Sequence, residues 1–451
     1  MRYDKTMKFA EDIFKAYDIR GKVPAELTPE VVEGVGRALA DYLPEGIVAV
    51  GHDMRNDSSQ LATAMIAGLT KQGREVMDIG QVASDMIYFV VGKYDLAGGA
   101  MITASHNPGE YNGIKLTGKG VAPIGIESGL EDIKQKVLSD DFKQSASIGT
   151  ITKKDVMSEW VQHALDLAGQ LKPMKVGADA GNGMAGPVVG QLMAKTELQI
   201  DGLYLDPDGS FPNHPANPLV EENLADLQKL VVDKQLQVGV AFDGDGDRAF
   251  LVDEKGEVVT GSVLGALIAR EILELHPGAT ILHNAICSHI VPDTITALGG
   301  KAIKTKVGHS FIKAKMKETG ALFAAEHSGH FYFADNYRAD SGLVAALKAF
   351  HILGQKDLPA SEQFAPFRKR YTQSGEINSE VRDAAAVLVL LKNKYSDGEQ
   401  DELDGLTVEY KDWWFNVRAS NTEPVIRLNV ESHDADLVKA KTDELLKLIR
   451  G

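Results

Sequence analysis

The sequence contains a single cysteine, Cys287, among 451 residues. This excludes an intramolecular disulfide and a zinc site built on several cysteines. No run reaches the ~18 uninterrupted apolar residues that a membrane helix needs, so no membrane partner is expected. The N-terminal stretch has scattered acidic residues and no apolar core, which argues against a secretory signal. These absences together predict a cytoplasmic protein.

Positive charge is also scarce. The chain has 48 Lys and Arg against 64 Asp and Glu, a formal net charge of −16. Such an acidic surface argues against nucleic acid or an anionic membrane as a partner. An anionic small substrate remains compatible with the sequence, provided that basic side chains gather locally.

Short apolar runs alternate with amphipathic patterns along most of the chain. The sequence predicts buried strands at 46–50, 98–102, 174–178, 238–242 and 279–282, and helices at 61–73, 262–275 and 309–320. This alternation is typical of α/β layers with mostly parallel sheets. The end of the chain differs, because 408–420 and 424–432 alternate like antiparallel strands before a helix at 435–450. A smaller α+β domain is therefore predicted there.

The length exceeds one ordinary core and suggests roughly three or four domains. Polar breaks at 143–153, 253–257 and 355–366 give predicted domains at 1–150, 151–254, 255–366 and 367–451. A helix–Gly–strand–Gly rhythm recurs at 65–80 and 294–308, which hints that the α/β domains are related.

The apolar run 98–102 stops at the segment 103–108, TASHNP. Ser105 or Asn107 capping a turn is one interpretation. The other is a nucleophilic serine displayed at a strand end, where α/β sheets place their ligands. The neighbourhood lacks the G-x-S-x-G elbow of many serine hydrolases. Lys115, further along, could position or protonate a transferring group.

Asp243, Asp245 and Asp247 alternate with two glycines. Three carboxylates at this spacing suit a hard divalent cation, since without one they repel each other. An EF-hand is excluded because its sixth position requires glycine and is Arg248, and because both flanks read as strands. An acidic hairpin turn is the alternative. Three protein ligands leave room for a phosphate oxygen or water, as Mg²⁺ requires in phosphoryl transfer.

Glu326, Ser328 and His330 recur at every second position. On an extended loop they would face one way and could bind sugar hydroxyls, although an ordinary strand end has the same period.

A last polar segment lies near the C-terminal end. Within five positions it offers a guanidinium, two hydroxyls and an amide, from Arg418, Ser420, Asn421 and Thr422. This composition suits a compact phosphate-binding nest, and it also suits a capped turn.

The four segments together predict a phosphosugar phosphotransferase. No G-x-x-x-x-G-K-[ST] and no strand-linked G-x-G-x-x-G is present, so ATP is not the expected phosphoryl donor. A phosphorylated Ser105 would supply the phosphoryl group instead.

These motifs, with FKAYDIRG at 14–21 and TKVGHSFIKAKM at 305–316, resemble the α-D-phosphohexomutase family over the whole chain. The resemblance is greatest to its phosphomannomutase/phosphoglucomutase branch. It implies three related mixed α/β domains around a central cleft plus a smaller C-terminal α+β domain. It also implies reversible phosphoryl transfer between the 1- and 6-positions of mannose or glucose phosphates, in a monomer or homodimer. The intermediate would be a hexose 1,6-bisphosphate, which also serves as activator, and Mg²⁺ would be the cofactor.

The resemblance implies a role for each matching residue. Ser105 would be the phosphoserine and would complete a Mg²⁺ site with Asp243, Asp245 and Asp247. Lys115 and His330 would serve as general acid and base, with Arg20 and Arg248 beside the transferring phosphoryl group. Substrate would contact Tyr17, His309, Glu326 and Ser328, and its distal phosphate would bind Arg418, Ser420, Asn421 and Thr422.

Some positions depart from the family pattern. Ile286 stands where many members have a basic residue, and Ala325 replaces a common glycine. His327 stands where Met or Gln marks the best-known branches. Because Gln there would indicate phosphoglucosamine mutase, that alternative is weakened but stays open. A non-catalytic hexose-phosphate-binding protein and a metal-dependent phosphatase are further alternatives. Ser105, the three aspartates and Lys115 argue against a pure binder.

Overall fold

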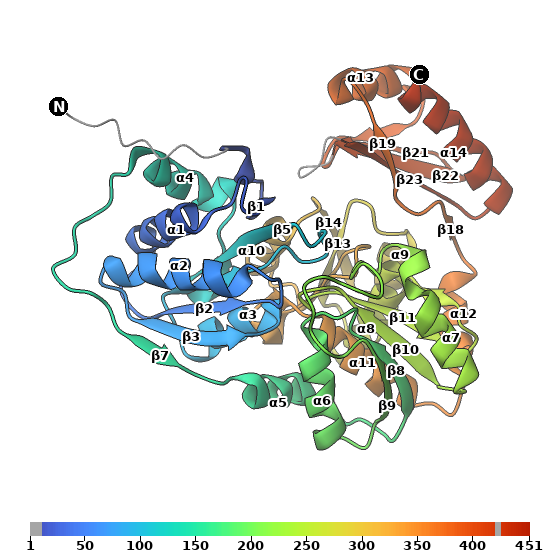
Figure 1. Ribbon diagram of the computed structural model, residues 1–451. Coiled ribbons are helices and arrows are strands. Elements are labelled where there is room, and N and C mark those ends of the chain that lie inside the picture. The colour runs from blue at the N-terminus through green and yellow to red at the C-terminus, as the bar shows by residue number, and fades with distance from the viewer. Residues whose placement is uncertain (1–10, 420–424) are drawn as a thin grey trace. The chain divides into compact units, whose positions relative to one another are not determined.

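The computed structural model describes residues 11–419 and 425–451. They form two units. The first comprises residues 11–259 and 328–360, and the second comprises 260–327 with the described part of 361–451. Figure 1 shows the helices and strands of each unit. Within the described ranges, no helix combines the length and the apolar character that crossing a bilayer requires.

The first unit begins with a mixed sheet in the order β1-β5-β4-β2-β3-β7, and β6 pairs with β5. Its strands are β1 (Ile19–Lys22), β2 (Val48–His52), β3 (Val76–Gln81), β4 (Gly98–Ile102), β5 (Tyr111–Gly118), β6 (Ala122–Pro123) and β7 (Ile151–Lys153). β2 is parallel to β3 and β4, whereas β5 is antiparallel to β4. Helices α1 (Pro29–Tyr42), α2 (Ser58–Lys71) and α4 (Leu130–Ser139) share a hydrophobic core with this sheet. Helix α3 (Ser84–Lys93) packs on β2 and β4.

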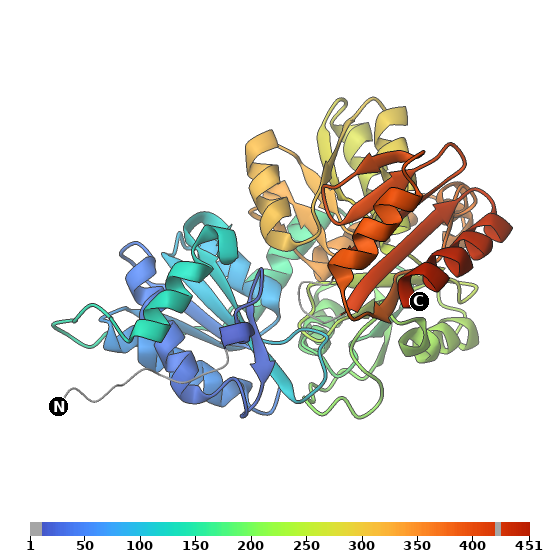
Figure 2. The same cartoon turned by 90° about the horizontal axis from the view of Figure 1, so that it is seen from above.

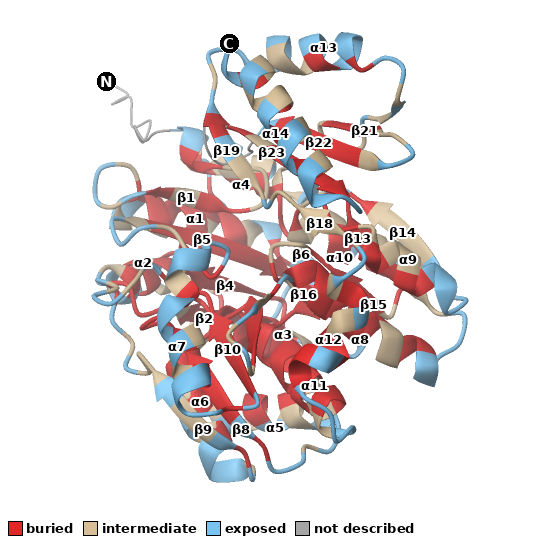
Figure 3. Cartoon of the chain, turned by 90° about the vertical axis from the view of Figure 1, so that its right-hand side faces the viewer, coloured by how far each residue is buried: buried red, intermediate tan, exposed pale blue. Residues whose placement is uncertain are grey.

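The second sheet of this unit has the order β12-β11-β10-β8-β9. Its strands are β8 (Lys175–Asp179), β9 (Gln199–Leu203), β10 (Val238–Phe242), β11 (Ala249–Asp253) and β12 (Val258–Val259). The accompanying helices are α5 (Met157–Ala168), α6 (Ala185–Lys195), α7 (Ala225–Asp233) and α11 (Gly342–Gly354), and a hairpin of β16 (Phe331–Phe333) and β17 (Ala339–Asp340) precedes α11. Figure 3 shows β2, β4 and β10 as buried strands, which explains their continuous apolar sequences.

The second unit contains three parallel strands, β13 (Thr280–Asn284), β14 (Lys301–Thr305) and β15 (Phe323–Ala325). Its helices here are α8 (Gly261–Leu275), α9 (Ile290–Ala297), α10 (His309–Thr319) and α12 (Ala360–Arg368). An antiparallel sheet follows, built from β18 (Thr372–Gln373), β19 (Ile377–Glu380), β20 (Glu399–Asp401), β21 (Leu406–Glu409), β22 (Trp413–Ala419) and β23 (Val425–Ser432). Helices α13 (Ala384–Lys394) and α14 (Ala435–Arg450) share a hydrophobic core with it and lie on one face of this sheet in Figure 2.

Much of this agrees with the sequence-based expectations. The strands predicted at 98–102 and 238–242 and the helix at 435–450 have those bounds. Helix α10 ends, as predicted, at a glycine, because Gly320 takes the left-handed φ of 67°. The α/β class with a C-terminal α+β domain is confirmed, with mixed rather than mostly parallel sheets. The central cleft stays a prediction.

The predicted polar breaks contain ordered elements. Segment 143–153 includes β7, whose three exposed residues pair with β3. Segment 253–257 is the turn between β11 and β12, where the Asp253 carboxylate accepts hydrogen bonds from the N–H groups of Lys255 and Glu257. Segment 355–366 includes most of α12. A domain bound at 150 or 254 would therefore divide a sheet.

Candidate active site

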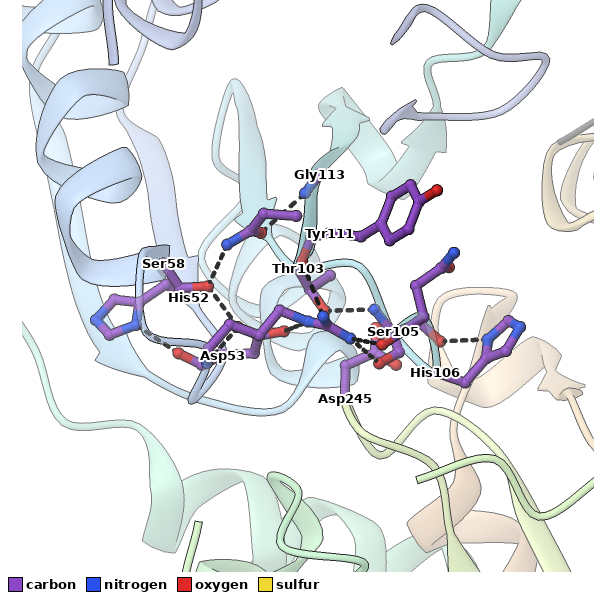
Figure 4. Close-up of polar contacts among 12 residues, drawn as sticks. His52, Asp53, Ser58, Thr103, Ser105, His106, Tyr111, Gly113 and Asp245 are labelled. Carbon is purple, nitrogen blue, oxygen red and sulfur yellow. Dashed lines mark hydrogen bonds and ion pairs between the residues drawn. The ribbon is translucent and has the colours of Figure 1, made fainter. Parts of the chain in front are cut away.

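Ser105 lies in the loop between β4 and β5. Its backbone has the left-handed φ of 52°, an uncommon conformation for serine. The Ser105 N–H donates to Thr103 Oγ1 at 2.9 Å, and the side chain is buried near the end of the strand (Figure 4). Ser105 is one of ten described non-glycine residues with positive φ, and such a backbone persists only where surrounding contacts enforce it.

The loop between β10 and β11 carries the three aspartates. Asp243, Asp245 and Asp247 are all at most 1% exposed, and one carboxylate oxygen from each lies within 4.8 Å of the others. Gly246, with φ of 78°, makes the turn that brings the side chains together. Ser105 Oγ donates to Asp243 Oδ2 at 2.7 Å. The serine and the acidic cluster therefore form one site within the first unit.

Cationic side chains face this cluster. Lys115 Nζ, from β5, donates to Asp245 Oδ2 at 2.6 Å and to Asp247 Oδ2 at 2.5 Å. Burial opposes the charge on Lys115, but the two carboxylates outweigh it and raise the pKa of Lys115 well above its usual range. Arg248 donates its backbone N–H to Asp243 Oδ1 at 3.2 Å, and its Nε lies 3.5 Å from Asp243 Oδ2.

Further predicted residues extend the site. His330 Nε2 lies 3.4 Å from Asp247 Oδ1 and accepts from Arg248 Nε at 3.2 Å, and Ser328 Oγ lies 3.0 Å from His330 Nδ1. Arg20 donates to the side chain of Asn107, two residues beyond Ser105. One set of contacts in the first unit thus includes Ser105, Lys115, Arg20, Arg248, Ser328, His330 and the three aspartates. Tyr17 is half-buried in the loop before β1.

The acidic cluster fits a divalent cation. Asp245 Oδ1 is buried and has no hydrogen-bond donor in the described part of the chain. Burial, followed by repulsion from Asp247 and Asp245, raises the pKa of Asp243 well above its usual range. A bound cation would relieve this repulsion, and carboxylate oxygens are the ligands that Mg²⁺ prefers. A second group of Asp247, His330 and Asp340 also lies within coordinating reach.

Sequence reasoning missed two residues that hold the serine loop and the aspartate loop. Arg55, after β2, donates to the carbonyl oxygens of Ser105 and Asn107. Ser84, the first residue of α3, donates its side chain to Asp245 Oδ2 and its N–H to the Asp245 carbonyl oxygen. Several of these contacts end on backbone oxygens, which no residue pattern reveals.

The second unit contains the remaining predicted residues. Glu326 is buried and accepts from the Gly308 N–H at 3.1 Å and from Asn284 Nδ2 at 3.2 Å. His309 is the first residue of α10. Ile286, in the loop after β13, is 1% exposed, so it lies within the core.

Arg418 on β22 has a partner that the sequence did not suggest. The Glu376 carboxylate accepts hydrogen bonds from Arg418 Nη2 at 2.9 Å and from Arg427 Nη1 at 3.1 Å. His327 Nε2 lies 3.7 Å from Glu376 Oε2. Burial lowers the pKa of His327 to about 4. Ser420, Asn421 and Thr422 lie outside the described residues.

Comparison with known proteins gives a consistent result. Sequence models of the phosphoglucomutase/phosphomannomutase domains match in order, with alpha/beta/alpha domains I, II and III at 11–144, 158–256 and 260–371 and the C-terminal domain at 376–448. The phosphomannomutase of Salmonella montevideo is 37% identical over 450 residues, which cover 97% of this chain and 99% of that protein.

Two further relatives agree. A protein of Xanthomonas campestris pv. campestris (strain B100) named "Phosphohexose mutases" is 37% identical over 443 residues, covering 97% of this chain and 99% of its own length. The crystal structure of a phosphoglucomutase/phosphomannomutase family protein from Burkholderia thailandensis matches with a TM-score of 0.89 at 31% identity, covering 98% of this chain and 97% of that one. Four domain matches in order and full-length similarity lead to one conclusion: this chain is an enzyme of the phosphoglucomutase/phosphomannomutase family.

Proposed function

We propose that the enzyme moves a phosphoryl group between the 1- and 6-positions of mannose and glucose phosphates through a phosphorylated Ser105. The observation that carries this proposal is the position of Ser105, which lies in a left-handed backbone conformation with Oγ 2.7 Å from Asp243. Family membership and the names of the relatives support the hexose phosphate substrate. We further propose that hexose 1,6-bisphosphate primes the enzyme. The enzyme would be cytoplasmic, as a monomer or a homodimer.

The proposed chemistry has two mirrored steps. The free hydroxyl of a hexose phosphate attacks the phosphorus, the bond between phosphorus and Ser105 Oγ breaks, and a bond to the sugar oxygen forms. The hydroxyl proton passes to a base, and Ser105 Oγ takes a proton from an acid. The hexose 1,6-bisphosphate then turns around and returns its other phosphoryl group to Ser105.

We assign the proton transfers to Lys115 and His330, which lie 2.5 Å and 3.4 Å from carboxylate oxygens of Asp247. Arg20 and Arg248 would neutralise charge on the transferring group. When bound, Mg²⁺ would supply further charge neutralisation, held by Ser105 and the three aspartates. Asp245 Oδ1, buried without a donor among the described residues, supports its place among the ligands.

Substrate contacts are assigned by resemblance. We propose that Tyr17 and His309 contact the sugar phosphate and that Glu326 and Ser328 bind the 3- and 4-hydroxyls. Arg418, with Ser420, Asn421 and Thr422, would bind the distal phosphate. The domains predicted at 1–150, 151–254, 255–366 and 367–451 are proposed with the first extended to Lys153 and the second to Val259, because β7 pairs with β3 and β12 pairs with β11.

A coupled assay with glucose, mannose and glucosamine 1-phosphates, primed with hexose 1,6-bisphosphate, tests the function. Glucose and mannose differ only at C2, and no C2 contact is assigned. Their kcat/KM values should therefore differ by no more than about 10–200-fold. Preference for glucosamine phosphate over both would favour phosphoglucosamine mutase. Intact mass should show one phosphate that glucose 6-phosphate removes, and Ser105→Ala should lose it.

A further inference from the structure

Arg55 lies just after β2, outside the residues to which a role has been assigned. Its side chain is 1% exposed. The guanidinium nevertheless contacts the whole loop that carries the serine. Nη2 donates to the carbonyl oxygens of Ser105 (2.7 Å) and Asn107 (2.6 Å), and Nη1 donates to those of Pro108 and Tyr111 (both 2.8 Å).

The guanidinium is itself held in place. Nε donates to Asp53 Oδ2 at 3.2 Å, and the Arg55 N–H donates to Asp53 Oδ1 at 3.0 Å. Asp53 also accepts from Ser58 Oγ at 2.5 Å, and Ser58 Oγ accepts from Asn112 Nδ2 at 2.9 Å. Figure 4 shows Asp53 and Ser58 beside the serine loop. Hydrogen bonds thus hold the serine loop at two places, through Arg55 and through Asn112.

The Arg55 guanidinium has five N–H donors in a planar fork, and five acceptors surround it. Lysine has only three donors on a single nitrogen, so it could not serve all five. The four loop carbonyl groups must converge on one cation, which restricts the backbone from Ser105 to Tyr111. The centroid of the Phe211 ring also lies 5.3 Å from the guanidinium carbon of Arg55.

We propose that Arg55 is the positioning residue for Ser105. It fixes the left-handed backbone of the serine and so aims Oγ at the aspartate loop. This inference rests on the proposed function, in which Oγ must occupy the same place in both half-reactions. A displacement of about 1 Å in a reacting atom lowers the rate by on the order of 10²-fold.

The chain offers a matched control in Arg74. It is 7% exposed, and its guanidinium likewise donates to backbone carbonyl oxygens, those of Ala40, Leu43 and Pro44. Arg74 lies in the same α/β domain as Arg55 but contacts a different loop. Replacing either arginine with lysine removes equivalent buried hydrogen bonds, and only Arg55→Lys disturbs the serine loop.

The test compares Arg55→Lys and Arg74→Lys in the full chain. We measure kcat and KM for one hexose 1-phosphate at saturating bisphosphate, the thermal midpoint, and hydrogen exchange of segment 103–113 without substrate. Arg55→Lys should lower kcat by about 10²-fold with KM within about 3-fold, and exchange in 103–113 should accelerate. Arg74→Lys should lose similar thermal stability and keep kcat within about 2-fold.

Retained kcat in a folded Arg55→Lys, or an equal kcat loss in both variants, overturns the proposal. If Arg55→Lys does not fold, Ser58→Ala loosens the same network more gently and should lower kcat about 3- to 10-fold at constant KM. An unchanged kcat then refutes the positioning role. If the wild type has no mutase activity, the proposed function fails. Hydrogen exchange still decides the inference, because equal exchange of 103–113 in the wild type and in both lysine variants contradicts it.

Discussion

The left-handed backbone of Ser105 predicts an unusual order of stability. Ser105→Ala and Ser105→Gly both remove the hydroxyl and its hydrogen bond to Asp243. A comparison of the two variants therefore isolates the free-energy cost of the left-handed backbone conformation at this position. We expect Ser105→Gly to be the more stable, although glycine is the less stable choice at most sites.

The magnitude follows from φ of 52° at Ser105. A left-handed conformation costs an L-residue about 1–2 kcal/mol, and glycine avoids this cost. Glycine loses about 0.5–1 kcal/mol relative to alanine through the greater freedom of its unfolded chain. The difference centres on about 0.75 kcal/mol in favour of Ser105→Gly, within a range of about 0–1.5 kcal/mol.

Thermal unfolding of the full-length variants checks this expectation. A difference of this size corresponds to about 1–4 °C in the transition of a domain of about 150–250 residues. The neighbouring Ala104 is buried and is not among the residues with positive φ, so Ala104→Gly is the control and should be destabilising. If Ser105→Gly melts at or below Ser105→Ala, the left-handed assignment is wrong. Both Ser105 variants should lose at least about tenfold in turnover, or ~1.4 kcal/mol, since both lack the proposed phosphoryl acceptor.

Three further outcomes are expected. Asp245→Asn should lower turnover by on the order of 10²-fold or more, because one partner of the transferring charge is lost; unchanged turnover of the wild type in excess EDTA would contradict the metal assignment. Glu376→Gln should lower the free energy of unfolding by about 3 kcal/mol, since two guanidiniums lose their shared carboxylate. Inorganic phosphate should restore part of this lost stability. Urea unfolding of the variant with and without phosphate tests both expectations. The hydrogen bond to Asp179 raises the pKa of His214, so this pair stabilises the fold below about pH 6.5 and the effect is lost as pH rises through the raised pKa. The stability difference between the wild type and His214→Gln should therefore shrink as the pH rises above about 6.5, and a constant difference would exclude the pair as its source.

The strands that the sequence predicted best are those whose burial is uniform. Strands β4 and β10 have no exposed residue, and their predicted and observed bounds coincide. Polar composition was a poorer guide to domain bounds. All three residues of β7 are exposed, and the β11–β12 turn is polar because its backbone is capped by Asp253. An edge strand or a hairpin turn therefore has the same composition as a linker.

The residues of the candidate site also form two groups, those that the sequence indicated and those that it did not. Ser105, the three aspartates and Lys115 could be identified as candidates because carboxylates, a hydroxyl and an amine have recognisable chemistry at those spacings. Arg55 and Glu376 were missed. Arg55 reaches the backbone of a segment 50 to 56 residues later, and Glu376 reaches arginines 42 and 51 residues later. Only the folded chain brings these partners together, and a backbone acceptor has no side-chain signature.

The φ of Ser105 could not be predicted, for a physical reason. Local preferences assign a left-handed residue to glycine or asparagine, so a sequence pattern places serine in an ordinary turn. The fold overrides that preference with contacts from two directions, since Arg55 binds the Ser105 carbonyl oxygen and Asp243 binds its hydroxyl. A residue that breaks a local rule and is held by convergent contacts is expected at a functional site rather than in a scaffold. The conformation therefore supports the proposed phosphoryl-carrying role of Ser105, on an observation that no sequence motif contains.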